Sequence, residues 1–341
     1  MTDSNPTLAH LLAAMRVADS TPDLEWAVVP APLSGGFWAQ MWRIRLAGAR
    51  PELSRELVAR VMPSARVAAR ETLVQDQLAR VGFATPAVRL AGEPGPQLDR
   101  AWMVMDLAPG RTLLAGLSGP SALLRLPRIA RDMPDRLATL AAALHTIDAD
   151  DIARALDADD EVGDLLARLD DQTTSLGFTD LALLARWLRR HRPAGHRRAV
   201  CHGDLHPFNV LSAPSGDTVV DWSSALIADP AFDLAFTSLL LAHPPLAAPR
   251  PVQPVVNLAG RALSRRFLRT YAARSTTAIN ADQLEWFTLL HALRVLTEVA
   301  TWEDQDELGD HAGHPFLTLR APLAGRVNAA TDVVLRPVAV A

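Results

Sequence analysis

Strand-like segments, in which apolar residues alternate with polar ones, are concentrated in the first third of this 341-residue chain. Residues 41–46 are the clearest case, because apolar side chains there alternate with arginines as in a half-exposed strand. Pro109-Gly110 marks the end of the strand-rich part, since such a pair is typical of a turn or hinge. We expect strands at 26–29, 41–46, 57–62, 88–91 and 101–105, with helices at 7–18 and 66–81.

Helical periodicity dominates the rest of the chain. Apolar residues recur every three or four positions across 137–147, 165–169 and 284–300. Residues 209–212 and 218–221 flank a turn-rich connection and predict one hairpin within this helical part. The order predicts an α+β fold. Its expected parts are an N-terminal lobe at 1–108, a hinge near 105–110, a helical C-terminal lobe at 109–341, and an exposed proline-rich loop at 244–254.

Composition argues against several classes of protein. The single cysteine, Cys201, cannot build a disulfide framework within one chain. The polar N-terminus lacks the features of a secretory signal, and no apolar run is long enough to span a membrane. We therefore expect a cytoplasmic protein without a membrane partner. The net charge of −4 gives no basic field for nucleic acid.

Lysine is absent, and all 34 basic residues counted as Lys and Arg are arginine. Any site that ordinarily uses a lysine must therefore use an arginine here, with a planar fork in place of a point charge.

The segment His202-Gly203-Asp204-Leu205-His206-Pro207-Phe208-Asn209 carries the strongest chemical signal. It fits the catalytic-loop pattern His-x-Asp-Leu-x-x-x-Asn of kinases. In that pattern the aspartate accepts the proton of an attacking hydroxyl, and the asparagine five residues later reaches a metal ion on the phosphates. Asp204 is therefore the candidate base, and Asn209 is a candidate magnesium ligand.

A second carboxylate, Asp221, follows the apolar residues 218–220 at the predicted end of the hairpin. A carboxylate at a strand end, twelve residues after Asn209, corresponds to the magnesium-binding aspartate of kinases. Magnesium prefers a few hard oxygen ligands, with phosphates and water supplying the others. Asn209 and Asp221 are thus the predicted metal pair.

Together with these two motifs, residues 228–235, Ala-Asp-Pro-Ala-Phe-Asp-Leu-Ala, complete a three-part pattern. The stretch 202–235 resembles the aminoglycoside phosphotransferase family, which is also called the choline/ethanolamine-kinase-like family and is related in fold to protein kinases. The resemblance implies a bilobal, protein kinase-like fold, Mg²⁺, ATP or GTP as co-substrate, and a small hydroxylated molecule as acceptor.

The same resemblance extends to the N-terminal part. It implies that Arg60 occupies the position of the phosphate-binding lysine and that Glu71 is its ion-pair partner. It implies that a loop between the first strands covers the phosphates and that a hinge reads the nucleotide base through its backbone. The loop residues are Ser34, Gly35 and Gly36, and the hinge residues are Met105, Asp106 and Leu107.

Three further residues are expected to support the catalytic loop: His202, His206 and Asp229. We expect Asp229 to accept backbone N–H groups of that loop and Asp233 to cap the next helix. Phe208 stands where the family has a small residue, so it is expected to pack under the loop or to narrow the acceptor site.

The acceptor itself is left open by the sequence: an aminoglycoside or macrolide antibiotic, a sugar, an amino-alcohol such as choline, and a hydroxyacyl thioester all fit the resemblance. Acidic clusters at 157–164 and 303–310 are candidates for binding a cationic acceptor, although acidic runs are more often solvated surface. Two alternatives to a small-molecule kinase remain. One is a catalytically weak, nucleotide-binding regulator, and the other is a protein kinase, against which the absence of an Ala-Pro-Glu motif counts.

Overall fold

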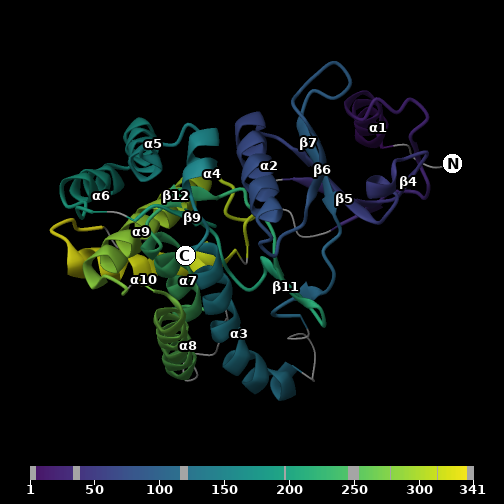
Figure 1. Cartoon of the computed structure of the whole chain (residues 1–341). Helices are drawn as coiled ribbons and strands as arrows, with labels where there is room; N and C mark the ends of the chain where they lie inside the picture. The colour runs from purple at the N-terminus through teal and green to yellow at the C-terminus, as the bar shows by residue number, and fades with distance from the viewer. Residues whose placement is uncertain are drawn as a thin grey trace. The chain divides into compact units, whose positions relative to one another are not determined.

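The computed structural model describes residues 5–33, 39–115, 122–195, 197–244, 253–276, 278–312 and 314–335. Contacts divide the chain into two compact units (Figure 1). Unit 1 comprises residues 1–115 and 208–225, and unit 2 comprises residues 116–207 and 226–341. The hairpin, which the sequence analysis assigned to the C-terminal lobe, therefore groups with the N-terminal residues. The α+β class and the kinase-like architecture are confirmed.

Unit 1 is built on a five-stranded antiparallel sheet in the order β2-β3-β5-β7-β6. Its strands are β2 (Ala31–Pro32), β3 (Gln40–Ile44), β5 (Leu57–Met62), β6 (Val88–Gly92) and β7 (Ala101–Asp106). Strand β5 lies in the middle of this sheet, and all six of its residues are buried. A central, doubly covered strand explains why 57–62 is almost continuously apolar, and it makes Arg60 an exception that needs partners.

Two helices cover the two faces of the sheet. Helix α1 (Pro6–Ala18) begins where the Asn5 side chain accepts the N–H of Thr7, and its residues share a core with Ala59 and Val61. Helix α2 (Ala65–Arg80) packs on the other face, where Ala68 joins a core with Val58. Because side chains of a strand alternate between faces, these two cores use alternate residues of β5.

Short strands complete unit 1. Strand β1 (Glu25–Trp26) pairs with β4 (Leu46–Ala47), and a short 3₁₀ turn, η1, spans Pro51–Leu53. Strands β10 (Val210–Ala213) and β11 (Gly216–Val219) form the predicted hairpin, and β8 (Arg111–Thr112) adds a third strand to it. The prediction of a strand at 26–29 is wrong beyond Trp26. Strand β4 offers only two residues for pairing, and Val28 and Val29 are exposed.

The turn predicted at Pro109-Gly110 lies between β7 and β8. Gly110 has a φ of 103°, and a Cβ added there would collide with the carbonyl group of Ser212 in β10. Both the left-handed backbone and the close approach of the hairpin strand require a residue without a side chain, which explains why glycine occupies this position.

Unit 2 is helical, and its core surrounds α9 (Ala281–Asp304), which contacts α5, α6, α7 and α10. Asn280 begins α9 by accepting the N–H groups of Asp282 and Gln283. The other helices are α3 (Ala122–Leu144), α4 (Asp150–Ala155), α5 (Glu161–Ser175), α6 (Thr179–Arg190), α7 (Ala231–Ala242), α8 (Gln253–Arg274) and α10 (Pro315–Ala330). Two strands, β9 (Ala199–Cys201) and β12 (Leu226–Ala228), pair beside them.

The proline-rich run at 244–254 was predicted to be an exposed loop, and the structure differs from this prediction at the C-terminal end of the run. Residues 245–252 lie outside the described residues, but α8 already begins at Gln253, so Pro254 is helical. Proline is tolerated there because the first helical turn does not need its N–H. Within the described ranges, no helix is both long and apolar enough to cross a membrane.

Candidate active site

The catalytic-loop motif begins directly at the end of β9 in unit 2. Gly203 has a φ of 76°, a left-handed conformation that glycine adopts without strain. Its N–H donates to Asp233 and its carbonyl accepts from Arg294, so both backbone groups are fixed. This conformation explains why glycine occupies the variable second position of the motif.

Asp204 lies beside His206, with 3.4 Å between Oδ2 of the aspartate and Nε2 of the histidine. Burial raises the pKa of Asp204, but the charges of His206, Arg294 and His202 and a hydrogen bond from His206 outweigh it, so the pKa is lowered. The carboxylate is therefore ionised at neutral pH. It can accept a hydroxyl proton, as a base in phosphoryl transfer must.

Arg294 is a residue of the site that was not predicted from the sequence. It lies in the middle of α9, donates to the carbonyl oxygen of Gly203 at 2.8 Å, and stacks over Phe236 at 5.2 Å from the ring centroid. A single arginine within the apolar run 284–300 was the available signal, because a cation inside a buried helix needs a specific partner.

The two aspartates after the hairpin have exchanged roles relative to the prediction. Asp233 accepts the catalytic-loop N–H groups of His202 and Gly203, at 2.8 and 2.7 Å. Asp229 instead accepts the N–H of Ala231 at the beginning of α7 and the N–H of Arg197. Asp233 lies inside the first turn of α7, where its buried side chain faces the loop and does not cap the helix.

His202 is fully buried, and its Nδ1 accepts the N–H of Asp204 at 3.2 Å. This contact agrees with a supporting role, because it fixes the backbone at the candidate base. Phe208 is half exposed, which contradicts the expectation that it packs under the loop.

In unit 1, the guanidinium of Arg60 joins two carboxylates. It donates to Glu71 of α2 through Nη1, and its Nη2 lies 3.8 Å from Oδ1 of Asp221. Burial raises the pKa of Glu71 to about 7, with Arg60 opposing the shift and Asp221 adding to it. Nε of Arg60 is buried without a hydrogen-bond partner among the described residues.

Asp221 follows β11 by two residues, in a left-handed conformation with a φ of 68°. Its Oδ1 accepts the hydroxyl of Ser223 at 2.8 Å, and about a third of the side chain is exposed. Trp222 anchors the segment, because it is fully buried and donates to the hydroxyl of Thr85. Asn209 is buried, and its backbone carbonyl accepts the N–H of Val220.

The donor set of Asn209 and Asp221 suits Mg²⁺. An amide oxygen and a carboxylate are hard ligands, and two protein ligands leave the remaining positions for phosphates and water. The strained backbone at Asp221 also fits a functional site, since such conformations persist only where surrounding structure imposes them.

The hinge residues end β7. Met105 pairs with Val58 of β5, and the carboxylate of Asp106 is held by a bidentate bond from Arg89. The N–H groups of Asp106 and Leu107 donate to the carbonyl oxygens of Ala87 and Glu56, at 3.0 and 3.4 Å. Base recognition by this backbone therefore stays a prediction. Ser34, Gly35 and Gly36 lie outside the described residues, although β2 and β3 on either side of them pair as antiparallel strands.

Both acidic clusters contain residues with structural partners. Asp160 caps α5 through the N–H of Gly163 and forms two hydrogen bonds with Arg192. Glu303 pairs with Arg320. These pairings favour the structural interpretation of the clusters over cation binding.

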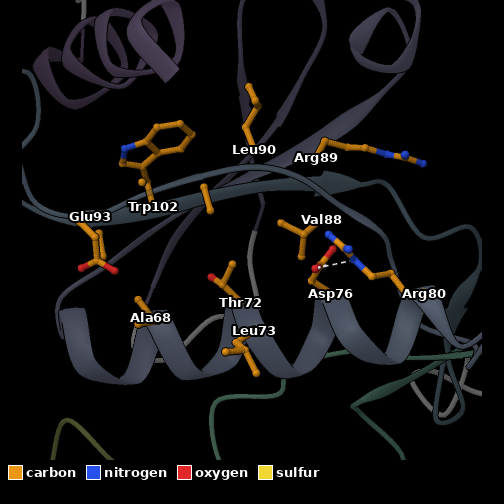
Figure 2. A pocket seen from close by; sticks show the side chains of 14 residues that line it. Ala68, Thr72, Leu73, Asp76, Arg80, Val88, Arg89, Leu90, Glu93 and Trp102 are labelled. Atoms are coloured by element: carbon orange, nitrogen blue, oxygen red, sulfur yellow. Dashed lines mark ion pairs between the residues drawn. The ribbon is translucent and has the colours of Figure 1, made fainter. Parts of the chain in front are cut away.

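One groove of about 540 Å³ lies between α2 and strands β6 and β7 (Figure 2). An ion pair of 2.8 Å between Asp76 and Arg80 lies on the α2 side of its lining. None of the predicted site residues lines it, so it is not the candidate nucleotide site.

Comparisons with known proteins identify the family. Residues 30–263 match the model of the phosphotransferase enzyme family. An aminoglycoside 3'-phosphotransferase of Streptomyces fradiae is 31% identical over 79% of this chain and 95% of its own length. A crystal structure of an aminoglycoside-3'-phosphotransferase of type VIII is 28% identical, with a TM-score of 0.55, over 85% of this chain and 99% of that one.

A more distant structure shares the fold. It is a thermostable mutant of the aminoglycoside phosphotransferase APH(4)-Ia in ternary complex with AMP-PNP and hygromycin B, 18% identical with a TM-score of 0.53, over 90% of this chain and 96% of that one. With most of the chain matched by the family model, and with a curated relative covered almost end to end, this protein belongs to the phosphotransferase enzyme family.

Proposed function

We propose that this protein transfers the γ-phosphate of ATP or GTP, in the presence of Mg²⁺, to a hydroxyl group of a small molecule. Family membership makes it a phosphotransferase with an alcohol group as acceptor. The identities of the nucleotide, the metal ion and the acceptor belong to the proposal. The distant relative holding AMP-PNP and hygromycin B supports a nucleotide and a hydroxylated antibiotic as the pair of substrates.

The observation that carries the proposal is the buried arginine of β5. Arg60 is 6% exposed, is oriented by Glu71, and keeps an unused Nε donor among the described residues. A buried cation held in a fixed orientation is suited to phosphate oxygens, which arginine binds through its planar fork. We assign Arg60 to the α- and β-phosphates, with Glu71 holding its orientation.

The remaining roles follow from the chemistry of each side chain. Asn209 and Asp221 would hold Mg²⁺, which when bound neutralises charge on the phosphates. Asp204, whose pKa is lowered, accepts the proton of the acceptor hydroxyl as it attacks. His206 and Arg294 keep that carboxylate ionised. Catalysis then consists mainly of positioning and charge stabilisation.

For the acceptor we propose an antibiotic of the aminoglycoside or macrolide type, a sugar or an amino-alcohol, with an aminoglycoside first because the curated relatives are aminoglycoside 3'-phosphotransferases. Such an enzyme would confer antibiotic resistance. It would act in the cytoplasm, where nucleoside triphosphates are available.

The test is a panel assay. The full chain is incubated with ATP or GTP, with and without Mg²⁺, and with aminoglycosides, macrolides, sugars and amino-alcohols, and phosphorylated products are detected by mass spectrometry. We expect one acceptor class to be phosphorylated only when Mg²⁺ is present, and Asp204→Asn to slow formation of the product by roughly 10²- to 10⁴-fold. Nucleotide binding without transfer to any acceptor would instead support a catalytically weak regulator.

A further inference from the structure

A buried line of polar groups crosses the core of unit 2. It consists of Tyr271 on α8, His145 just after α3, and Asp233 on α7, none of which is more than 4% exposed. Nδ1 of His145 lies 2.9 Å from the tyrosine hydroxyl, and Nε2 lies 3.1 Å from Oδ2 of the aspartate. Buried polar groups in an apolar core are costly, so a fully paired set of this kind requires a reason.

The ionised carboxylate of Asp233 fixes which group donates in its hydrogen bond with His145. Burial raises the pKa of Asp233, but its hydrogen bond to His145, nearby charges and its bond from Gly203 lower it overall, so it is an ionised acceptor. Nε2 of His145 must then carry a proton and donate a hydrogen bond to this carboxylate. Nδ1 on the other side of the ring forms the hydrogen bond with the hydroxyl of Tyr271, which can act as donor or as acceptor.

Asp233 connects this line to the catalytic loop. Its Oδ2 also accepts the N–H of His202, and its Oδ1 accepts the N–H of Gly203. Both residues immediately precede Asp204, whose own N–H donates to Nδ1 of His202. A continuous series of hydrogen bonds therefore leads from Tyr271 to the backbone of the candidate base.

We propose that His145 and Tyr271 are positioning residues, which hold the carboxylate of Asp233 in the one orientation that fixes the loop presenting Asp204. The proposal rests on the role of Asp204 as the base. His145 shares Oδ2 with the N–H of His202, so without it the carboxylate is free to rotate away from the N–H groups of His202 and Gly203. A small misplacement of a reacting group is enough to reduce the rate strongly.

A metal site is the competing interpretation of the same residues. The ligand atoms of His145, Cys201 and Asp233 lie within 4.8 Å of one another. Each is already occupied, however: the thiol of Cys201 lies 3.5 Å from the carbonyl oxygen of Asp229, and burial raises its pKa. A metal would need the thiolate, so the hydrogen-bonded arrangement is favoured.

Four variants of the full chain separate the possibilities. His145→Leu removes the donor to Asp233, whereas His145→Gln can replace it, since a glutamine amide reaches to a similar position. Tyr271→Phe removes one hydroxyl and little volume. Cys201→Ala is the matched control, because it changes an equally buried neighbour that has no part in the proposed series.

Two measurements are made on each variant: kcat and KM for phosphate transfer, corrected for the folded fraction, and hydrogen exchange of the His202 and Gly203 amides. We expect His145→Leu to lower kcat about 100-fold with the nucleotide KM unchanged, and to speed exchange of both amides. Tyr271→Phe should lower kcat about threefold to tenfold. His145→Gln and Cys201→Ala should stay near the wild type.

The proposal is wrong if His145→Leu and Tyr271→Phe leave kcat and amide exchange within about twofold of the wild type. It is also wrong if Cys201→Ala is as damaging as His145→Leu and the purified protein contains stoichiometric zinc. If the wild type phosphorylates no acceptor, the proposed function fails separately, and amide exchange alone then decides whether His145 positions the loop.

Discussion

Nη2 of Arg60 lies 3.8 Å from Oδ1 of Asp221, while Nη1 of the same guanidinium donates to Glu71. One arginine thus joins helix α2 to the segment that follows the hairpin. In a chain without lysine, this double contact uses what arginine has and lysine lacks, namely several donors in a fixed plane.

Removing the Arg60 charge should therefore affect stability as well as activity. Arg60→Met would leave Glu71 buried without its partner, which costs about 3 to 5 kcal/mol. The double variant Arg60→Met/Glu71→Met should recover much of this loss, because both charges are then absent. Urea unfolding measures the difference. Similar stabilities for the single variant and the wild type would show that Glu71 is not dependent on Arg60.

Arg60→Lys should keep the fold but not the nucleotide site. One ammonium cannot contact Glu71 and Asp221 and still offer a donor to phosphate with the same geometry, so we expect the nucleotide KM to rise about tenfold with a smaller change in kcat. Steady-state kinetics with varied nucleotide check this. An unchanged KM would remove Arg60 from the phosphate site.

Asp204→Asn preserves the size of the side chain while removing the base. General-base catalysis contributes roughly 10²- to 10⁴-fold, so kcat should fall by that order while the nucleotide Kd stays the same. Transfer kinetics and nucleotide titration are the two measurements. A variant that retains near wild-type kcat would show that another group accepts the proton.

The dependence of the rate on Mg²⁺ concentration should distinguish variants of the two proposed metal ligands from a variant of the base. Chelation by EDTA should abolish transfer, and Asp221→Asn should raise the Mg²⁺ concentration for half-maximal rate more than Asn209→Ala, because a charged ligand binds the ion more strongly than an amide. Asp204→Asn is the control, since it should lower the rate without moving this concentration. Equal Mg²⁺ dependence in all three variants would contradict the assignment.

Much of the fold could be read from the sequence because its signals are local. The alternation at 41–46 and the apolar run at 57–62 predicted β3 and β5, and periodicity predicted α9. The short strands were harder. The end of the strand expected at 26–29 depends on the length of β4, a partner some twenty residues away that no local pattern reveals.

The site divides in the same way. Asp204, Asn209 and Asp221 lie in fixed spacings and were found from the sequence. Arg294 and His145 were not, because each is distant in the sequence and acquires its role only through tertiary contacts with the loop or with Asp233. The roles of Asp229 and Asp233 were exchanged for a related reason: the two lie about one helical turn apart, both could cap or support, and only packing decides between them.

His291 should make folding sensitive to acid. It is fully buried on α9, donates from Nε2 to the carbonyl oxygen of Phe232 at 2.9 Å, and has its Nδ1 buried without a partner among the described residues. Burial, assisted by the charge of Arg294, lowers its pKa from 6.5 to about 3. The ring is therefore neutral in the folded protein, whereas the unfolded chain takes up a proton as the pH falls below 6.5.

The sign of the effect follows from these two pKa values. The stabilisation is present above pH 6.5 and is lost as the pH falls towards 3, at about 1.4 kcal/mol per pH unit for one proton. His291→Gln keeps a donor for Phe232 and cannot titrate, so the free energy of unfolding of the wild type should fall relative to this variant across that range. Urea unfolding at several pH values measures both curves. If the curves run parallel between about pH 6.5 and 4, then the imidazole of His291 is protonated in the folded protein as readily as in the unfolded chain, and the buried Nδ1 has access to water.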